Sequence, residues 1–150
     1  MLPLAACAGN GGGPGADDAS APAECRPVGA DLAAQAAVQV PVELRDFSFS
    51  PTELEARAGV VAFTARNVGS ENHELAFLPG GGDVPVANGR PDEGALERAG
   101  AFELEALGPG QACQATYDLR PGVYTLFCIV TSSDGTTHYD KGMRGRLVVQ

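Results

Sequence analysis

Alternation of apolar and polar residues is the sequence feature that most constrains the fold of this chain. Val38, Val40, Val42 and Leu44 alternate with polar residues and one proline. A period of two over this length predicts a half-buried strand, because successive side chains of a strand point to opposite faces. Further strands are predicted over residues 54–57, 60–68, 73–78, 101–107, 111–119, 123–130 and 142–150.

Glycine and proline separate these segments at regular intervals. The chain has 150 residues, with 20 Gly and 11 Pro, enough for one domain with a hydrophobic core but not comfortably for two. Seven or eight short strands divided by such turns predict an all-β fold, a β-sandwich or barrel. One short helical segment is expected near residues 91–98, with Pro91 near its start and acidic residues in its first turn.

The N-terminal part has a different composition. Leu4-Ala5-Ala6-Cys7 resembles a bacterial lipobox, so residues 1–7 are expected to be the remnant of a lipoprotein signal, with a lipid on Cys7. Residues 8–30 are expected to form a flexible Gly/Ala/Pro-rich tether, and residues 31–150 the folded domain. This organisation places the protein outside the cytoplasm, lipid-anchored to a membrane. The alternative is a disordered tail on a secreted or soluble protein.

The net charge of the chain bears on its partners. A formal charge of -9 argues against a nucleic-acid partner, which would require a basic face.

Four residues of metal-binding type are expected at one end of this fold. Cys128 lies near the end of one predicted strand and Met143 near the start of the next, with His138 on the loop between them. His73 begins another strand and shares a face with apolar residues. Two imidazoles, one thiolate and one thioether form the ligand set of a type 1 copper centre. Taken singly, each of these residues is more often a core residue. Their order, spacing and strand context together favour the metal.

Three motifs extend this interpretation to a family. The stretches NVGSENHELAF, LRPGVYTLFC and HYDKGMRGRLVV resemble those of the cupredoxins, the family of plastocyanin and azurin. The resemblance implies a Greek-key β-sandwich that holds one type 1 copper through His73, Cys128, His138 and Met143. It also implies a monomer that is not an enzyme and that shuttles single electrons between extracytoplasmic redox protein partners.

The chain departs from the family pattern at two places. The nine residues 129–137 separate Cys128 from His138, more than in most relatives. Lengthening a loop whose ends stay fixed costs on the order of 0.6 kcal/mol per doubling. The insert 131–137 is therefore expected to bulge outward and to alter the surface around His138, the usual electron exit in the family. Glu74 stands where many relatives have Asn, and alternation directs it away from the core.

The remaining cysteines suggest a covalent link. If Cys7 carries lipid and Cys128 binds copper, Cys25 and Cys113 are left as a pair that could form a disulfide in an oxidising compartment. The alternative is that Cys113 is a buried free thiol.

Three functions fit the sequence. The leading hypothesis is an electron-transfer protein with one type 1 copper. A protein that stores, delivers or senses copper without relaying electrons is the alternative, and a metal-free interaction domain is a third.

Overall fold

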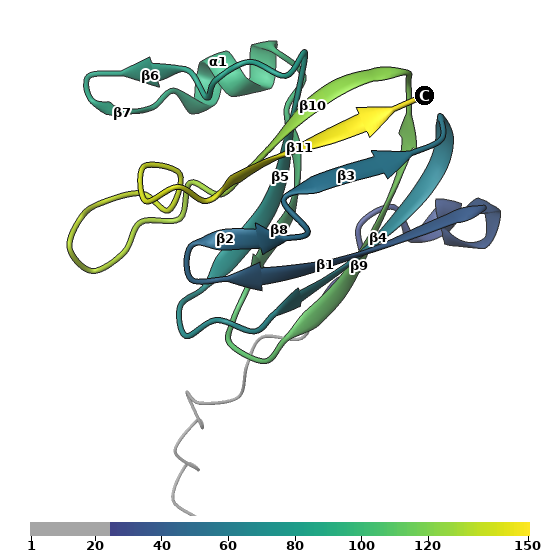
Figure 1. Ribbon diagram of the computed structural model, residues 1–150, viewed down its shortest axis with the longest axis horizontal. Helices are drawn as coiled ribbons and strands as arrows, with labels where there is room; N and C mark the ends of the chain where they lie inside the picture. Colours follow the sequence, from purple (N-terminus) through teal and green to yellow (C-terminus); the bar gives the residue numbers. More distant parts are fainter. Residues whose placement is uncertain (1–24) are drawn as a thin grey trace, which may run out of the picture.

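The structure is a computed structural model that describes residues 25–150. The expected lipobox, Cys7 and the tether as far as residue 24 lie outside the described residues. Two β-sheets face each other, and the loops of one end of this sandwich gather on the left of Figure 1. The predicted all-β sandwich is therefore confirmed.

The first sheet has four strands. Its spatial order is β2 (Ser48–Ser50), β1 (Val38–Arg45), β4 (Gly59–Asn67) and β9 (Ala112–Leu119). β1 runs parallel to β4, and the other two pairs are antiparallel. Pro41 is tolerated in β1 because β2 pairs only with positions 43–45, so β1 is an edge strand where the proline lies.

The second sheet has five strands and carries much of the candidate site. Its order is β3 (Glu53–Ala56), β11 (Arg144–Val149), β10 (Gly122–Phe127), β5 (His73–Pro79) and β8 (Phe102–Leu107). Only β3 and β11 are parallel in this sheet. The two sheets together hold nine strands, slightly more than the seven or eight expected, since the chain after β1 forms two very short strands, β2 and β3, in different sheets.

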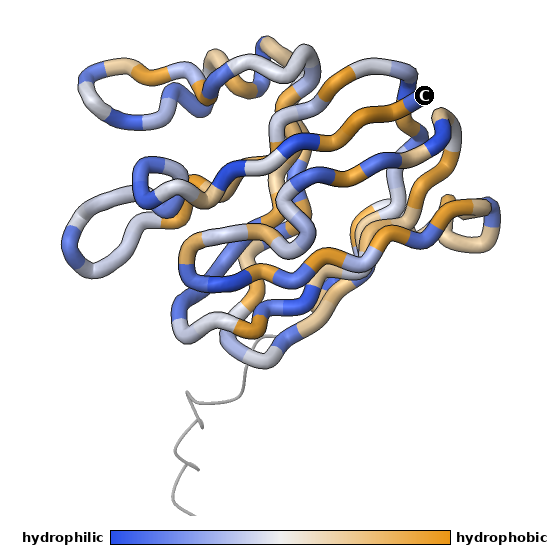
Figure 2. Tube along the Cα trace, in the orientation of Figure 1, coloured by the Kyte–Doolittle hydropathy of each residue, from blue (hydrophilic) through white to orange (hydrophobic). Residues whose placement is uncertain are grey.

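Apolar side chains from both sheets form the core between them. The alternation predicted for β1 is observed, with Val40, Val42 and Leu44 buried, and Figure 2 shows apolar and polar residues alternating along the strands. Phe77 packs between Phe63 and Phe102, at ring-centroid distances of 4.8 and 4.9 Å. Each fully buried side chain of this size contributes about 1.5–3 kcal/mol to the stability of the fold.

A smaller apolar cluster covers the outer face of β5. It contains Leu78, Leu96 and Tyr139 among others, and Leu96 belongs to α1 (Glu93–Arg98). α1 confirms the predicted helical segment, and its N-cap Asp92 accepts a hydrogen bond from the Ala95 N–H at 2.9 Å. The hairpin of β6 (Val86–Ala87) and β7 (Arg90–Pro91) precedes it. Because of this cluster, six successive residues of β5 are buried rather than alternate ones.

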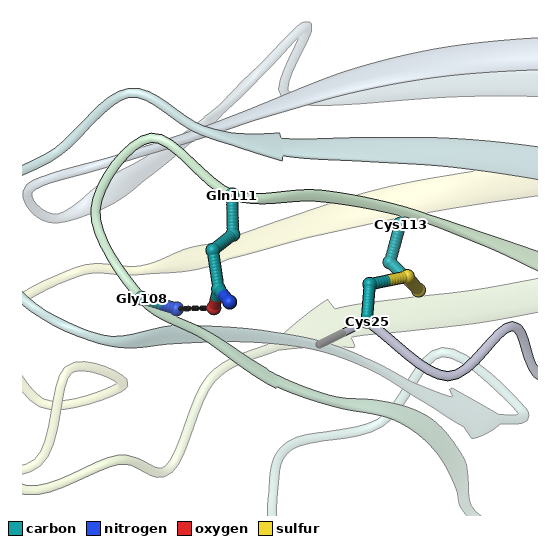
Figure 3. Close-up of a disulfide and its surroundings, with 4 residues drawn as sticks. All are labelled: Cys25, Gly108, Gln111 and Cys113. Carbon is teal, nitrogen blue, oxygen red and sulfur yellow. Dashed lines mark hydrogen bonds between the residues drawn. A yellow bond between two sulfur atoms is a disulfide. The ribbon is translucent and has the colours of Figure 1, made fainter. Parts of the chain in front are cut away.

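The N-terminal segment of the described chain is attached to β9. Cys25 and Cys113 form a disulfide with a Cα–Cα distance of 5.6 Å (Figure 3). Val28 forms a parallel bridge with Ala115, and a 3₁₀ helix (Ala30–Gln35) follows. The predicted pairing of the two cysteines is thus present, and residues 25–29 pack on the sandwich although the sequence placed them in the tether.

Within residues 25–150, no helix combines the length and apolar character needed to span a bilayer.

Candidate metal centre

His73, Cys128 and His138 meet at one end of the sandwich. One nitrogen of each imidazole and the Cys128 sulfur all lie within 4.8 Å of one another, and all three residues are buried. The two Nδ1 atoms are 3.0 Å apart, and Cys128 Sγ is 3.4 Å from His138 Nδ1. Three of the four residues predicted as ligands are therefore brought together, with their donor atoms directed at one another.

The second sheet positions two of these donors. His73 is the first residue of β5, and Cys128 follows Phe127, the last residue of β10. β5 and β10 are neighbouring antiparallel strands, so the start of one lies beside the end of the other. The backbone N–H of Glu74 approaches Cys128 Sγ at 3.4 Å, which ties the two strand ends together next to the site.

The loop from 128 to 143 brings the third donor back to the same place. The His138 N–H donates to the Val130 carbonyl at 2.8 Å, and the His138 carbonyl accepts from the Met143 N–H at 2.8 Å. Met143 is fully buried in the same core cluster as Cys128. The loop therefore folds back on itself, and Met143, the fourth predicted ligand, is buried in the core and bonded through its backbone to His138.

The outer nitrogen of His73 contacts a carboxylate from the β1–β2 turn. Asp46 Oδ1 is 2.6 Å from His73 Nε2. Hydrogen bonds hold the pKa of Asp46 well below its usual range despite partial burial, the largest contribution coming from the Ser70 hydroxyl. Asp46 is therefore ionised and accepts a hydrogen bond from the His73 Nε2–H, which directs Nδ1 toward the other donors.

The outer nitrogen of His138 contacts a second carboxylate. Glu71 Oε2 lies 3.0 Å from His138 Nε2 and accepts a hydrogen bond from the Ser132 hydroxyl at 2.7 Å. These hydrogen bonds lower the pKa of Glu71, and the bond from Ser132 makes the largest contribution. Burial lowers the pKa of His138 and so favours its neutral imidazole. It donates from Nε2 to Glu71, which again leaves Nδ1 as the inward lone pair.

Glycine is required at position 69 beside the Asp46–His73 pair. A Cβ atom there would collide with Asp46 Oδ1 and lie 2.7 Å from His73 Nε2. The NVGSEN turn thus approaches the Asp46 carboxylate so closely that position 69 has room for the hydrogen of glycine but not for a Cβ atom.

Glu74 points away from the core between the sheets, as alternation predicted, but it is not solvent-exposed: the residue is only 9% exposed. Its Oε1 accepts a hydrogen bond from the Ile129 N–H at 2.6 Å. Burial raises the pKa of Glu74 to about 7. Glu74, the residue after His73, is therefore bonded to Ile129, the residue after Cys128.

The chemistry of these donors fits a soft, thiophilic metal ion. Burial raises the pKa of the Cys128 thiol to about 12, so a buried cation at this position would replace the proton and stabilise the thiolate. One thiolate and two imidazoles with outer nitrogens held by carboxylates match a type 1 copper ligand set. Ser132 donates to Glu71 and not to a histidine nitrogen, so the group lacks the serine–histidine contact of a hydrolase.

Sequence reasoning missed the supporting residues Asp46, Glu71 and Ser132. Asp46 follows the last residue of β1 and Glu71 lies two positions before His73, in turns where acidic residues are common. The only available signal was the presence of carboxylates in turns next to predicted strand ends, and that signal is weak.

Solved structures with the same fold include two auracyanins. A dithionite-reduced auracyanin from the photosynthetic bacterium Roseiflexus castenholzii is 20% identical, with a TM-score of 0.59, over 77% of this chain and 98% of its own. Auracyanin A, titled a "blue" copper protein from the green thermophilic photosynthetic bacterium Chloroflexus aurantiacus, is 21% identical, with a TM-score of 0.55, over 83% and 100%. No protein-family model and no curated protein matches the chain. The two auracyanins show that the chain has the cupredoxin fold.

Proposed function

We propose that this chain of cupredoxin fold binds one type 1 copper ion and carries single electrons. His73, Cys128 and His138 would hold the metal, with Met143 as a weak fourth ligand. The observation that carries this proposal is the buried cluster of two imidazole nitrogens and one thiol within 4.8 Å of one another. The name of auracyanin A, a blue copper protein with this fold, supports the same metal.

Burial of the donors favours electron transfer over catalysis. His73, Cys128 and His138 have no exposed surface, and a catalytic metal needs an open position for its substrate. An electron can tunnel through a few ångströms of packed protein. A substrate could reach the metal only if the protein around the donors moved aside. Copper bound here would supply one-electron exchange between Cu(I) and Cu(II). The residues of the chain exclude water and orient the donors, and we therefore infer that the protein is an electron carrier and not an enzyme.

The proposal includes a place outside the cytoplasm. The Cys25–Cys113 disulfide supports an oxidising compartment, because structural disulfides are rare in the cytosol. A lipid on Cys7 followed by the tether would attach a monomeric carrier to a membrane, where it would exchange electrons with redox partner proteins.

Copper handling without electron relay is the second candidate. It is favoured by the thiolate donor of the buried cluster, because a soft donor would hold Cu(I) tightly whether or not an electron is exchanged.

Copper reconstitution distinguishes these functions. We would strip metal from the full chain, add Cu(II), and record the visible and EPR spectra with the bound metal quantified, since zinc can occupy the same donors. Intense thiolate-to-copper absorption that is lost in Cys128→Ala and kept in Cys7→Ser supports a type 1 centre. A colourless protein that binds only Cu(I) supports copper handling, and absence of copper binding would contradict both.

A further inference from the structure

We infer that Glu71 is a positioning residue for the His138 ligand, and that the long loop between Cys128 and His138 supplies Ser132 to hold it there. This inference rests on the proposed copper site. It assigns a structural task to the insert 131–137.

The inference starts from a carboxylate shared between two loops. Glu71 lies in the turn before β5, whereas Ser132 and His138 belong to the loop after β10. One oxygen, Glu71 Oε2, lies 3.0 Å from His138 Nε2 and 2.7 Å from the Ser132 hydroxyl. The turn that carries the His73 ligand therefore also holds the His138 ligand, through a residue two positions away from His73.

The insert is folded so that one of its serines faces inward. The Ser132 N–H donates to the Thr136 carbonyl, and the Gly135 N–H donates to the Ser132 carbonyl, both at 2.9 Å. Thr131 and Thr137 form an antiparallel bridge at the base of this small hairpin. Ser132 is only 6% exposed, whereas the neighbouring Ser133 is exposed. The extra residues thus form a compact hairpin that directs one hydroxyl at Glu71.

The backbone of Glu71 is fixed independently of the insert. Its carbonyl accepts a hydrogen bond at 2.8 Å from the side-chain amide of Asn67, which is completely buried. Its N–H donates to Asp46 at 3.3 Å. The Glu71 backbone is thus fixed, and one oxygen of its carboxylate is already bonded to Ser132. The side chain therefore loses little conformational freedom when it accepts a hydrogen bond from His138.

The rest of the surroundings closes the His138 ring from solvent. The Phe47 ring lies 4.9 Å from the His138 ring in an edge contact, and the Lys141 ammonium lies over Phe47 at 4.6 Å from its centroid. With water excluded, Glu71 is the acceptor available to the His138 Nε2–H. It therefore selects the tautomer with a free Nδ1 directed at Cys128 and His73, and its charge raises the basicity of that nitrogen.

The test uses Glu71→Ala, Glu71→Gln and Ser132→Ala, with Ser133→Ala as the matched control. In the metal-free protein, NMR of the imidazole nitrogens reports the His138 tautomer and the exchange rate of its Nε2–H. Wild type and Ser133→Ala should show a slowly exchanging Nε2–H. Exchange should be at least about 10-fold faster in Glu71→Ala and intermediate in Ser132→Ala.

Copper affinity separates the charge of Glu71 from its hydrogen bond. Glutamine keeps an acceptor oxygen, so Glu71→Gln should retain the tautomer and slow exchange. Loss of the negative charge should nevertheless weaken Cu(II) binding by about 10-fold, because residues that support metal ligands typically contribute 10–100-fold. The reduction potential should rise, since the lost charge stabilises Cu(II) more than Cu(I).

Two results would overturn the inference. One is unchanged His138 exchange and unchanged Cu(II) affinity in both Glu71 variants. The other is an equal effect of Ser132→Ala and Ser133→Ala. Should Glu71→Ala fail to fold by circular dichroism, Glu71→Gln and Ser132→Ala decide the question. Absence of blue absorption in the wild type would contradict the proposed function, whereas the NMR measurements need no metal and still test the role of Glu71.

Discussion

The Cys25–Cys113 disulfide makes a prediction whose size follows from its position in the chain. Its two cysteines are separated by 88 residues. In the chain-entropy model, a cross-link that closes a loop of this length restricts the unfolded state by about 15 cal/mol/K, which is about 4.6 kcal/mol at 25 °C. Cys25 is only partly buried, so its replacement by alanine removes little packing. We expect Cys25→Ala to lower the free energy of unfolding by about 3–5 kcal/mol.

Guanidinium unfolding of metal-free protein, followed by circular dichroism, measures this loss. All variants should carry Cys7→Ser, so that Cys128 is the only free thiol while the disulfide is intact. Reduction of the parent protein should reproduce the loss seen in Cys25→Ala, and thiol labelling after unfolding should count one cysteine before reduction and three after it. A loss below about 1 kcal/mol, with the bond shown to be present in the parent, would refute the entropic reasoning.

Three further changes test the site and the core. Gly69→Ala should lower stability by about 1–3 kcal/mol and weaken copper binding, because its Cβ would displace Asp46 or His73; denaturation and copper titration measure both. Tyr117→Phe should raise stability by about 1 kcal/mol, because the Tyr117 hydroxyl is buried without a partner among the described residues. Burial also raises the pKa of Tyr117, so the wild type should lose stability relative to Tyr117→Phe as the pH rises above about 10. Met143→Leu should change stability by less than about 1.5 kcal/mol while raising the copper reduction potential, because a weak donor to Cu(II) is lost.

Each of these changes has a result that would contradict it. Gly82→Ala is the control for Gly69→Ala, since nothing lies within 4 Å of its added Cβ. Equal effects of the two substitutions on stability and copper binding would show that Asp46 and His73 accommodate the Gly69 Cβ without loss. A Tyr117→Phe protein that is less stable at pH 7 would mean that the hydroxyl is hydrogen-bonded, and one equally sensitive to alkali would mean that the hydroxyl is hydrated in the folded protein. An unchanged potential and visible spectrum in Met143→Leu would remove Met143 from the ligand set.

The strands and the chemistry of the donors could be predicted because both are local properties of the sequence. Alternation along residues 38–44 identifies β1 and its inward face without knowledge of any partner strand. Cys128, His138 and Met143 lie within one short segment, so a single loop was sufficient to suggest that they meet. The short strands β2 and β3 were harder to resolve, because three or four residues carry too little pattern to show that they belong to different sheets.

The residues that support the imidazoles could not be predicted, because their partners are distant in sequence. Asp46 lies 27 positions from His73, and Glu71 lies 67 positions from His138 and 61 from Ser132. Many carboxylates and hydroxyls in turns have equivalent local surroundings, and nothing local indicates which of them will meet a buried nitrogen.

The sequence by itself determined the all-β architecture, the identity of the candidate metal donors and the possibility of the Cys25–Cys113 bond. Only the tertiary structure decided that His138 is closed from solvent, that Glu71, held by Ser132, contacts its outer nitrogen, and that Glu74 bonds to the residue after Cys128. The physical reason is range. Side-chain periodicity and donor chemistry are properties of a residue and its neighbours, whereas burial and hydrogen-bond partners depend on how two sheets and three loops pack together.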